Sequence, residues 1–228
     1  MRSAEFDHFA ASYEEELAKS LAATGEDRGF YARGRIARTA KCASGMGAEI
    51  RRIVDFGCGD GMNAPLLAAT FSGSQVRGVD ISGASIDRAR RLYSSGQVSF
   101  MHTDEWKPDG TTDLVFVNGV FHHIEPAEHM PCLGAIRRAL RPGGLLAFWE
   151  NNPWNPGTRY VMSRCSFDRE AIPINPRRAH EMLTQAGFSI VRSESHFYFP
   201  RPLRLLRPCE RWLRGLPLGG QYQVVCRG

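Results

Sequence analysis

Two hydrophobic rhythms divide this chain of 228 residues. Up to about residue 45, apolar positions such as Phe6, Phe9 and Tyr13 recur every three or four residues, which predicts amphipathic helices. The first helix should end at Gly25, and a second should cover about 29–43. Beyond residue 51, short apolar runs predict seven strands, at 53–56, 76–79, 98–101, 113–117, 145–149, 188–192 and 222–226.

Helical stretches separate these strands. They are expected from the glycine cluster after residue 56 to about Thr70, from Ser82 as N-cap to Leu92, over about 126–140 and over about 176–186. Strands alternating with helices indicate βαβ units and a parallel sheet in an α/β fold. The sequence from Glu150 to about Asn175 is less regular. No repeat or linker divides the chain, so we interpret 1–228 as one domain.

The carboxyl ends of the first two predicted strands carry residues suited to a nucleotide. Gly57 and Gly59 follow the first strand, where ligands bind in open α/β sheets, and glycine allows a ligand to touch the backbone. Asp80 ends the second strand, where its carboxylate can accept both hydroxyls of a ribose. Met62 stands where a dinucleotide-binding loop has its third glycine. Together with Asp55, this favours a cationic cofactor with an amino-acid tail over a pyrophosphate. A structural turn beside a solvated acid is the alternative.

Several motifs in order resemble those of the class I S-adenosylmethionine-dependent methyltransferases of the small-molecule type. The stretch 54–61 (VDFGCGDG) resembles their first motif, and 78–82 (GVDIS) resembles their second. The stretch 118–124 (NGVFHHI) resembles the segment after the fourth strand, and 140–146 (LRPGGLL) resembles the approach to the fifth. The resemblance is strong over roughly residues 50–150.

The resemblance implies a Rossmann-like, doubly wound sheet of seven mostly parallel strands, the last one antiparallel, with an N-terminal helical lid. Residues 1–45 would form the lid, 50–150 the cofactor-binding core, and 151–228 the acceptor region and C-terminal strands. The implied cofactor is S-adenosyl-L-methionine, with Asp80 on the ribose and Asp104 on the adenine amino group. The full set of expected cofactor contacts is Asp55, Gly57, Cys58, Gly59, Asp80, Ile81, Asp104, Glu105, Asn118, Gly119, Tyr13 and Arg33.

The chemistry is expected after the fourth and fifth strands. Methyl transfer from a sulfonium is an in-line displacement, which chiefly requires an aligned and desolvated acceptor. His123 is the first candidate for a catalytic base, with a pKa near neutral, and a structural histidine is the alternative. His122, its direct neighbour, is expected to point elsewhere. The expected acceptor contacts, which would otherwise form a structural loop, are Asn151, Asn152, Trp154, Tyr160 and Arg164.

Composition narrows the classes of protein. The six cysteines form no CxxC pair, so we expect neither a disulfide framework nor a metal site. The chain contains no apolar run of about 20 residues and has acids near its start where a signal peptide would be apolar, so we expect a cytoplasmic protein. The formal net charge is +5, with arginines at 201, 204, 207, 211 and 214. This stripe, with Leu205 and Trp212 beside it, predicts either peripheral contact with an anionic membrane or a solvated face whose apolar residues pack into the core.

Three other activities compete with transfer to a small-molecule or lipid-like acceptor. A cyclase or lyase could use the same fold and cofactor, because a fold does not fix a reaction. A nucleic-acid methyltransferase is disfavoured, because 118–121 (NGVF) stands where such enzymes usually have a proline-aromatic motif, and no RNA-binding module is recognisable. A nicotinamide oxidoreductase is disfavoured by Met62.

Overall fold

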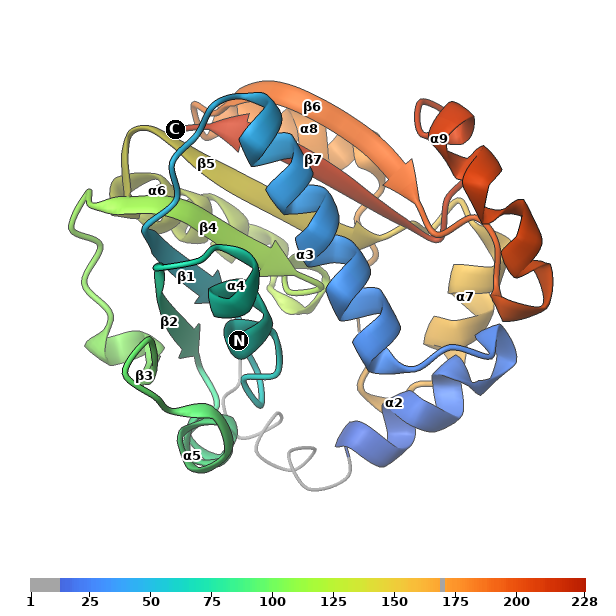
Figure 1. The fold of residues 1–228 in the computed structure, drawn as a ribbon, viewed down its shortest axis with the longest axis horizontal. Helices are drawn as coiled ribbons and strands as arrows, with labels where there is room; N and C mark the ends of the chain where they lie inside the picture. Colours follow the sequence, from blue (N-terminus) through green and yellow to red (C-terminus); the bar gives the residue numbers. More distant parts are fainter. Residues whose placement is uncertain (1–12, 169–170) are drawn as a thin grey trace.

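A seven-stranded sheet runs through the middle of the molecule (Figure 1). The computed structural model describes residues 13–168 and 171–228. The strands are β1 (Arg52–Phe56), β2 (Gln75–Asp80), β3 (Val98–His102), β4 (Thr112–Asn118), β5 (Leu140–Asn151), β6 (Ser189–His196) and β7 (Gln221–Arg227). They lie in the order β3-β2-β1-β4-β5-β7-β6, and only β7 is antiparallel to its neighbours among these pairs. The predicted doubly wound, mostly parallel sheet is confirmed.

The helices cover both faces of this sheet and one of its ends. They are α2 (Tyr13–Leu21), α3 (Arg28–Gly45), α4 (Asn63–Thr70), α5 (Gly83–Tyr93), α6 (His129–Ala139), α7 (Pro156–Ser163), α8 (Pro176–Gln185) and α9 (Glu210–Leu213). Short 3₁₀ turns join them: η1 (Ala22–Thr24), η2 (Thr103–Glu105), η3 (Phe121–His123), η4 (Pro126–Glu128), η5 (Ser166–Asp168) and η6 (Arg201–Cys209). As predicted, Ser82 caps its helix by accepting a hydrogen bond from Ser85 N at 3.1 Å.

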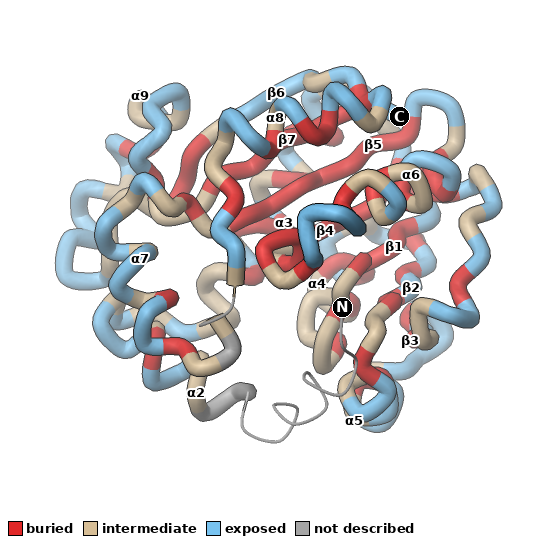
Figure 2. The backbone as a smooth tube through the Cα atoms, turned by 180° about the vertical axis from the view of Figure 1, so that it is seen from behind, coloured by how far each residue is buried: buried red, intermediate tan, exposed pale blue. Residues whose placement is uncertain are grey.

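Alternating side chains of the central strands build two cores. Val115 and Val117 of β4 belong to one buried cluster, which α6 and α8 cover, while Leu114 and Phe116 belong to the other, which α3, α4 and α5 cover. Trp149 of β5 joins the second cluster. Strands β4 and β5 are buried along most of their length, whereas the helices alternate between buried and exposed residues (Figure 2). A strand buried on both faces reads as a continuous apolar run, as these sequences do.

A buried threonine ties α3 to the sheet. Thr39 Oγ1 accepts hydrogen bonds from Trp149 Nε1 at 3.1 Å and from Gln223 Nε2 at 2.8 Å, which links α3 to β5 and β7. All three side chains are buried. Because no solvent reaches these donors, the hydroxyl of Thr39 fixes the position of α3 across the sheet.

Two boundaries differ from the sequence prediction. The helix predicted over 126–140 divides into η4 and α6, and β5 begins at Leu140 rather than at Leu145. Proline and glycine in 141–144 end the helix, as expected, but the chain continues in an extended form because Leu140 pairs with Thr112 of β4. Pairing across the sheet thus overrides a local stop signal.

The basic tail is folded but not buried. It forms η6 and the short α9, with a non-helical kink at Leu203. Leu205 is 87% exposed and Trp212 is 67% exposed, so the expectation that these two side chains pack into the core is wrong. Among the residues described, no helix has the length and apolar character needed to cross a bilayer.

We expect Thr39→Val to lower the free energy of unfolding by at least about 2 kcal/mol. The substitution preserves shape but leaves two buried N–H donors without an acceptor, and each such loss costs about 1–3 kcal/mol. Thr184→Val, at an exposed position of α8, is the matched control and should change stability by less than about 0.5 kcal/mol. Urea unfolding of the three proteins measures both values. Equal stabilities for Thr39→Val and the control would show that the hydroxyl has no structural role.

Candidate active site

The loop after β1 is shaped by glycines in the left-handed region. Gly57 has a φ of +71°, and a Cβ there would lie 2.4 Å from Val120 Cγ2. Gly59 has a φ of +53°, and a Cβ there would meet nothing within 4 Å, because it would point into open space. A side chain at either position would therefore be strained, and only glycine leaves the backbone at Gly59 open to a ligand.

Asp80 holds this loop in place from the end of β2. Its Oδ2 accepts a hydrogen bond from Gly59 N at 2.8 Å, and its Oδ1 accepts one from Ser82 N at 2.9 Å. Burial raises the pKa of Asp80, although these backbone donors oppose the shift. Each carboxylate oxygen has a second lone pair, so the side chain can still accept hydroxyl hydrogen bonds from a ribose.

A second acid, Asp55, lies behind the loop. It is 1% exposed, and its Oδ2 accepts no hydrogen bond among the described residues. Burial, reinforced by the nearby carboxylate of Asp80, raises the pKa of Asp55 to about 7. Two acids in a poorly solvated place favour a cation. The residues therefore fit a sulfonium cofactor with an ammonium group better than they fit a pyrophosphate.

A cavity of about 360 Å³, here called the glycine-loop cavity, opens beside Gly59. Most of the predicted cofactor contacts line it, namely Gly57, Cys58, Gly59, Asp80, Ile81, Asn118 and Gly119, and so does His123. The carboxyl ends of β1, β2 and β4 bring these residues together where the strand order reverses, as expected for an open α/β sheet.

Other predicted cofactor contacts lie outside both cavities. The side chain of Asp104 is 90% exposed, near His102 Nδ1 at 3.4 Å, and that of Glu105 is 60% exposed, near Arg90. Arg33 is 64% exposed on the outer side of α3, 3.9 Å from Asp27. The side chain of Tyr13, like Phe6 and Phe9, lies outside the described part of the chain.

A second cavity of about 600 Å³, here called the outer cavity, adjoins the first. Its walls come from α2, the first turns of α3, η3, α7 and residues 197–200. Helices α2 and α7 lie at one end of the molecule (Figure 1). Five residues line both cavities: Arg28, Asn63, Asn118, Gly119 and His123. A molecule in the outer cavity therefore reaches the glycine-loop cavity at these residues.

Arg28 joins α3 to the glycine loop. Its guanidinium donates two hydrogen bonds to Asp60, from Nη1 to Oδ2 at 2.5 Å and from Nη2 to Oδ1 at 2.7 Å. Burial alone would raise the pKa of Asp60, but these bonds outweigh burial and lower it. Bidentate pairs of this kind fix orientation as well as distance. Sequence reasoning missed Arg28 and proposed Arg33 instead.

Tyr31 and Arg35 lie on the same face of α3 as Arg28, which is the first residue of the helix. These residues are three and four positions apart, so they share one side of the helix, and all three line the outer cavity. Arg35 is only 6% exposed, and its Nη1 donates to Gln221 Oε1 at 3.1 Å. The spacing of positions 28, 31 and 35 is the sequence signal that would have found this face.

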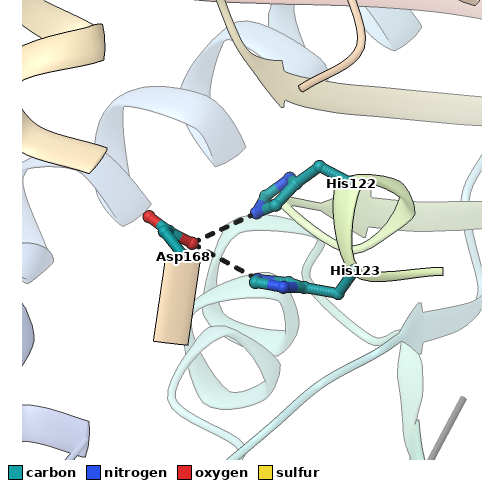
Figure 3. Close-up of side chains that lie close together, drawn as sticks. All are labelled: His122, His123 and Asp168. Carbon is teal, nitrogen blue, oxygen red and sulfur yellow. Dashed lines mark ion pairs between the residues drawn. The ribbon is translucent and has the colours of Figure 1, made fainter. Parts of the chain in front are cut away.

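Both histidines of η3 point toward Asp168 (Figure 3). His122 Nε2 lies 3.5 Å and His123 Nε2 lies 3.4 Å from Asp168 Oδ1, and the two rings are 4.1 Å apart. The expectation that His122 points elsewhere is wrong, because neighbours in a 3₁₀ turn differ in direction by about 120° rather than by the half-turn of a strand. No sequence signal singles out Asp168.

Glu150 completes this group from the end of β5. Its Oε2 lies 2.5 Å from His122 Nδ1, and its Oε1 accepts a hydrogen bond from Phe121 N at 2.8 Å. Burial works against a charge on His122, but the two carboxylates outweigh it and raise the pKa of His122 to about 10. Burial and the neighbouring His122 cation lower the pKa of His123 to about 4. The near-neutral pKa expected of His123 is therefore wrong, and its ring is uncharged at neutral pH.

The ligand atoms of His122, His123 and Asp168 lie within 4.8 Å of one another, close enough for a divalent cation. A metal ion binds an imidazole nitrogen that carries no proton. At neutral pH the raised pKa of His122 keeps protons on both of its nitrogens, between Glu150 and Asp168. In this protonation state the group is an ion-pair network, and a metal would have to displace a proton.

Two of the five predicted acceptor contacts line the outer cavity, and the other three do not. Asn151 and Tyr160 line the outer cavity. Asn152 is fully buried, and its Nδ2 donates to the carbonyl oxygens of Pro217 and Gly219, so its role is structural. Trp154 packs under the Arg177 guanidinium, at 5.9 Å from the ring centre, and lies outside both cavities. Arg164 stacks on Tyr160 at 5.6 Å, which confirms their shared helical face, but it also lies outside.

Comparisons with known proteins agree with this geometry. A family model described as a methyltransferase domain matches residues 53–144. The trans-aconitate 2-methyltransferase of Acidovorax sp. (strain JS42) is 37% identical over 99 residues, which are 42% of this chain and 37% of the relative. The enzyme of the same name from Shigella dysenteriae serotype 1 (strain Sd197) is 25% identical over 195 residues, 78% of this chain and 75% of the relative.

The chain thus covers little more than a third of the Acidovorax relative's length. An S-adenosylmethionine-dependent methyltransferase from Mesorhizobium loti has the same fold, with a TM-score of 0.61 and 21% identity over 82% of this chain and 96% of that one. The matched domain, the sheet order and the glycine loop opposite Asp80 lead to one conclusion: residues 53–144 carry a methyltransferase domain, within a fold similar to that of the S-adenosylmethionine-dependent methyltransferases.

Proposed function

We propose that this protein transfers a methyl group from S-adenosylmethionine to a small, carboxylate-bearing acceptor in the outer cavity. The observation that carries the proposal is the junction of the two cavities, where Arg28, Asn118 and His123 face both. When bound, the cofactor supplies a methyl group on a sulfonium. The protein then has to hold the acceptor in line and exclude water.

The glycine-loop cavity has residues for each part of the cofactor. Asp80 would accept the ribose hydroxyls, while Gly57, Cys58 and Gly59 would line the methionine portion through their backbone. The buried carboxylate of Asp55 would stabilise the positive charge of that portion. Assignment of the adenine amino group to Asp104 stays a prediction, because that side chain is exposed and outside the cavity.

Charge and size support a carboxylate acceptor. Arg28 and Arg35 line the outer cavity, whose volume of about 600 Å³ suits a small molecule. The Arg28 guanidinium is paired with Asp60, so Arg35 is the residue we propose to bind the acceptor. Guanidinium groups match carboxylates in a bidentate geometry. The relatives named above are called trans-aconitate 2-methyltransferases, and trans-aconitate carries three carboxylates.

The state of His123 supports the same class of acceptor. A base with a pKa of about 4 removes protons poorly at neutral pH, because general bases work best with a pKa near the working pH. A carboxylate oxygen needs no deprotonation before it attacks a methyl group. We therefore propose that His123 positions the acceptor as a neutral imidazole, while His122, Glu150 and Asp168 hold η3 in place.

The direct test supplies the protein with S-adenosylmethionine and a panel of small carboxylates, including trans-aconitate, beside alcohol and amine analogues. We expect S-adenosylhomocysteine and a methylated product only with carboxylates, as measured by mass spectrometry. Methylthioadenosine as the sulfur product would instead show a lyase or cyclase reaction. Turnover with the alcohols or amines alone would overturn the proposed acceptor class.

Asp80→Ala should weaken binding of S-adenosylhomocysteine at least tenfold. The substitution removes charge-assisted hydrogen bonds, each of which is worth roughly 1.5–3 kcal/mol. Isothermal titration calorimetry measures the affinity, and circular dichroism verifies that the variant is folded. Asp87→Ala, at an exposed carboxylate of α5, is the control and should bind as the wild type does. Equal affinity in a folded Asp80→Ala protein would remove Asp80 from the cofactor site.

Arg35→Gln should raise KM for a carboxylate acceptor at least tenfold and leave cofactor affinity unchanged. It removes one buried cation that faces the outer cavity, and hydrogen bonds to charged groups contribute about 1.5–3 kcal/mol. Arg35→Lys, which keeps the charge, should recover part of the loss. Lys41→Gln, at an exposed position of the same helix, should have no effect. An unchanged KM in Arg35→Gln would place the acceptor elsewhere.

His123→Gln should lower kcat by less than about tenfold on a carboxylate acceptor, because loss of a true general base would cost about 10²–10⁴-fold. The substitution should also leave the pH profile of kcat near neutral pH unchanged, since the pKa of His123 is about 4 and the group of the site that titrates near neutral pH is Asp55. Steady-state kinetics across pH measure both. A hundredfold loss with normal cofactor affinity would establish the proton-accepting role predicted from the sequence.

A further inference from the structure

The tail between β6 and β7 turns its apolar side chains outward. Eleven large apolar side chains are exposed among the described residues, and six of them lie between 203 and 218. They are Leu203 (48%), Leu205 (87%), Leu206 (45%), Trp212 (67%), Leu216 (49%) and Leu218 (55%). We call these six residues, with Arg201, Arg204 and Arg211, the tail surface. Isolated exposed leucines are normal, but such a cluster within one short segment needs a partner.

Two polar residues of the same segment, Glu210 and Arg207, face inward. Glu210 is 7% exposed, accepts hydrogen bonds from Tyr198 N and Phe199 N, and lies 3.5 Å from Arg38 Nη2 of α3. Arg207 donates to Glu26 Oε1 at 2.7 Å and stacks on Phe30. These contacts fix the side of the segment that meets the protein. The leucines and Trp212 are therefore held outward by specific polar bonds.

The tail surface is positively charged, which favours an anionic partner. Arg201, Arg204 and Arg211 are exposed beside the leucines, and the one acid between 200 and 220 is the buried Glu210. The Arg211 guanidinium lies 4.0 Å from the Trp212 ring centre, so cation and indole form one amphipathic unit. Exposed arginine, tryptophan and leucine gathered in one short segment are typical of protein segments that lie in the headgroup region of an anionic bilayer.

A nucleic acid fits this surface less well. Binding to phosphodiester chains uses basic residues interleaved with aromatic rings that stack on bases. Five of the six large apolar residues here are leucines, which insert among acyl chains but offer no stacking platform. Exposed leucines beside arginines therefore match a lipid surface with acyl chains and anionic headgroups.

We propose that the tail surface binds the face of a bilayer that contains anionic phospholipid. The leucines and Trp212 enter the headgroup boundary, and the three arginines pair with lipid phosphates. Residues 197–200, directly before this surface, line the outer cavity, so binding places the mouth of that cavity near the membrane.

Sedimentation with sucrose-loaded vesicles tests the proposal on the full chain. Vesicles of equal parts phosphatidylglycerol and phosphatidylcholine should pellet the protein at low salt, and the partition coefficient should fall at least tenfold at about 0.5 M salt, where the Debye length is only a few Å. Vesicles of phosphatidylcholine alone should bind at least tenfold more weakly. Failure to bind the anionic vesicles at low salt would overturn the proposal.

Two variants separate charge from apolar contact. Arg204→Gln with Arg211→Gln should weaken binding to anionic vesicles by roughly tenfold or more, because each basic residue near such a surface contributes about one factor of five. Leu205→Ser with Trp212→Ser should weaken binding at both salt concentrations. Arg207 is left unchanged because it also holds Glu26.

The matched control lies at the other end of the sheet. Arg91→Gln with Leu92→Ser, on α5, removes one exposed arginine and a leucine that is 55% exposed, and vesicle binding should not change. Calorimetry should show normal cofactor affinity in every variant, which verifies folding. If the wild type instead forms a dimer that Leu205→Ser with Trp212→Ser dissociates, and vesicles do not bind, a second copy covers the surface and the proposal is wrong.

Discussion

The bidentate ion pair between Arg28 and Asp60 determines how the two halves of the active site meet. It joins the first turn of α3, which belongs to the outer cavity, to the loop that shapes the glycine-loop cavity. Thr39, three turns further along α3, fixes the second half of the helix on β5 and β7. Held at both points, α3 presents Tyr31 and Arg35 to the outer cavity at a constant distance from the glycine loop.

The buried charges around His122 set the chemistry of the junction. His122 lies between two carboxylates and keeps its proton, and that charge lowers the pKa of its neighbour His123. His122 therefore has a structural role, and His123 is neutral where it lines both cavities. An active site organised in this way is suited to positioning an acceptor that already carries its nucleophilic lone pair, and poorly suited to removing a proton from an alcohol.

Much of the fold could be predicted from the sequence, because periodicity and glycine loops are local signals. All seven strands, the N-cap at Ser82, and Gly57, Gly59 and Asp80 in the cavity follow from such signals. The contacts at Cys58, Ile81, Asn118 and Gly119 were expected from the resemblance to the methyltransferase motifs. Asp168 and Arg28 could not be predicted, since each reaches the site from a distant segment through tertiary packing. The expected orientation of His122 failed because a strand-like alternation was assumed where the chain forms a 3₁₀ turn. One of two alternatives predicted that Leu205 and Trp212 are buried, but both are exposed, because the hydrogen bonds of the buried Glu210 fix the opposite side of the segment against the protein.

A chain of side-chain contacts at the start of α3 connects the tail to the glycine loop. Arg207 holds Glu26, two residues before Arg28, and Arg28 holds Asp60. Thermodynamic linkage makes such a connection reciprocal: if attachment of the tail changes the affinity of the loop for its ligand by some factor, occupancy of the loop changes the strength of attachment by the same factor. With such a coupling, the fraction of the enzyme on the membrane would change with the fraction that carries cofactor.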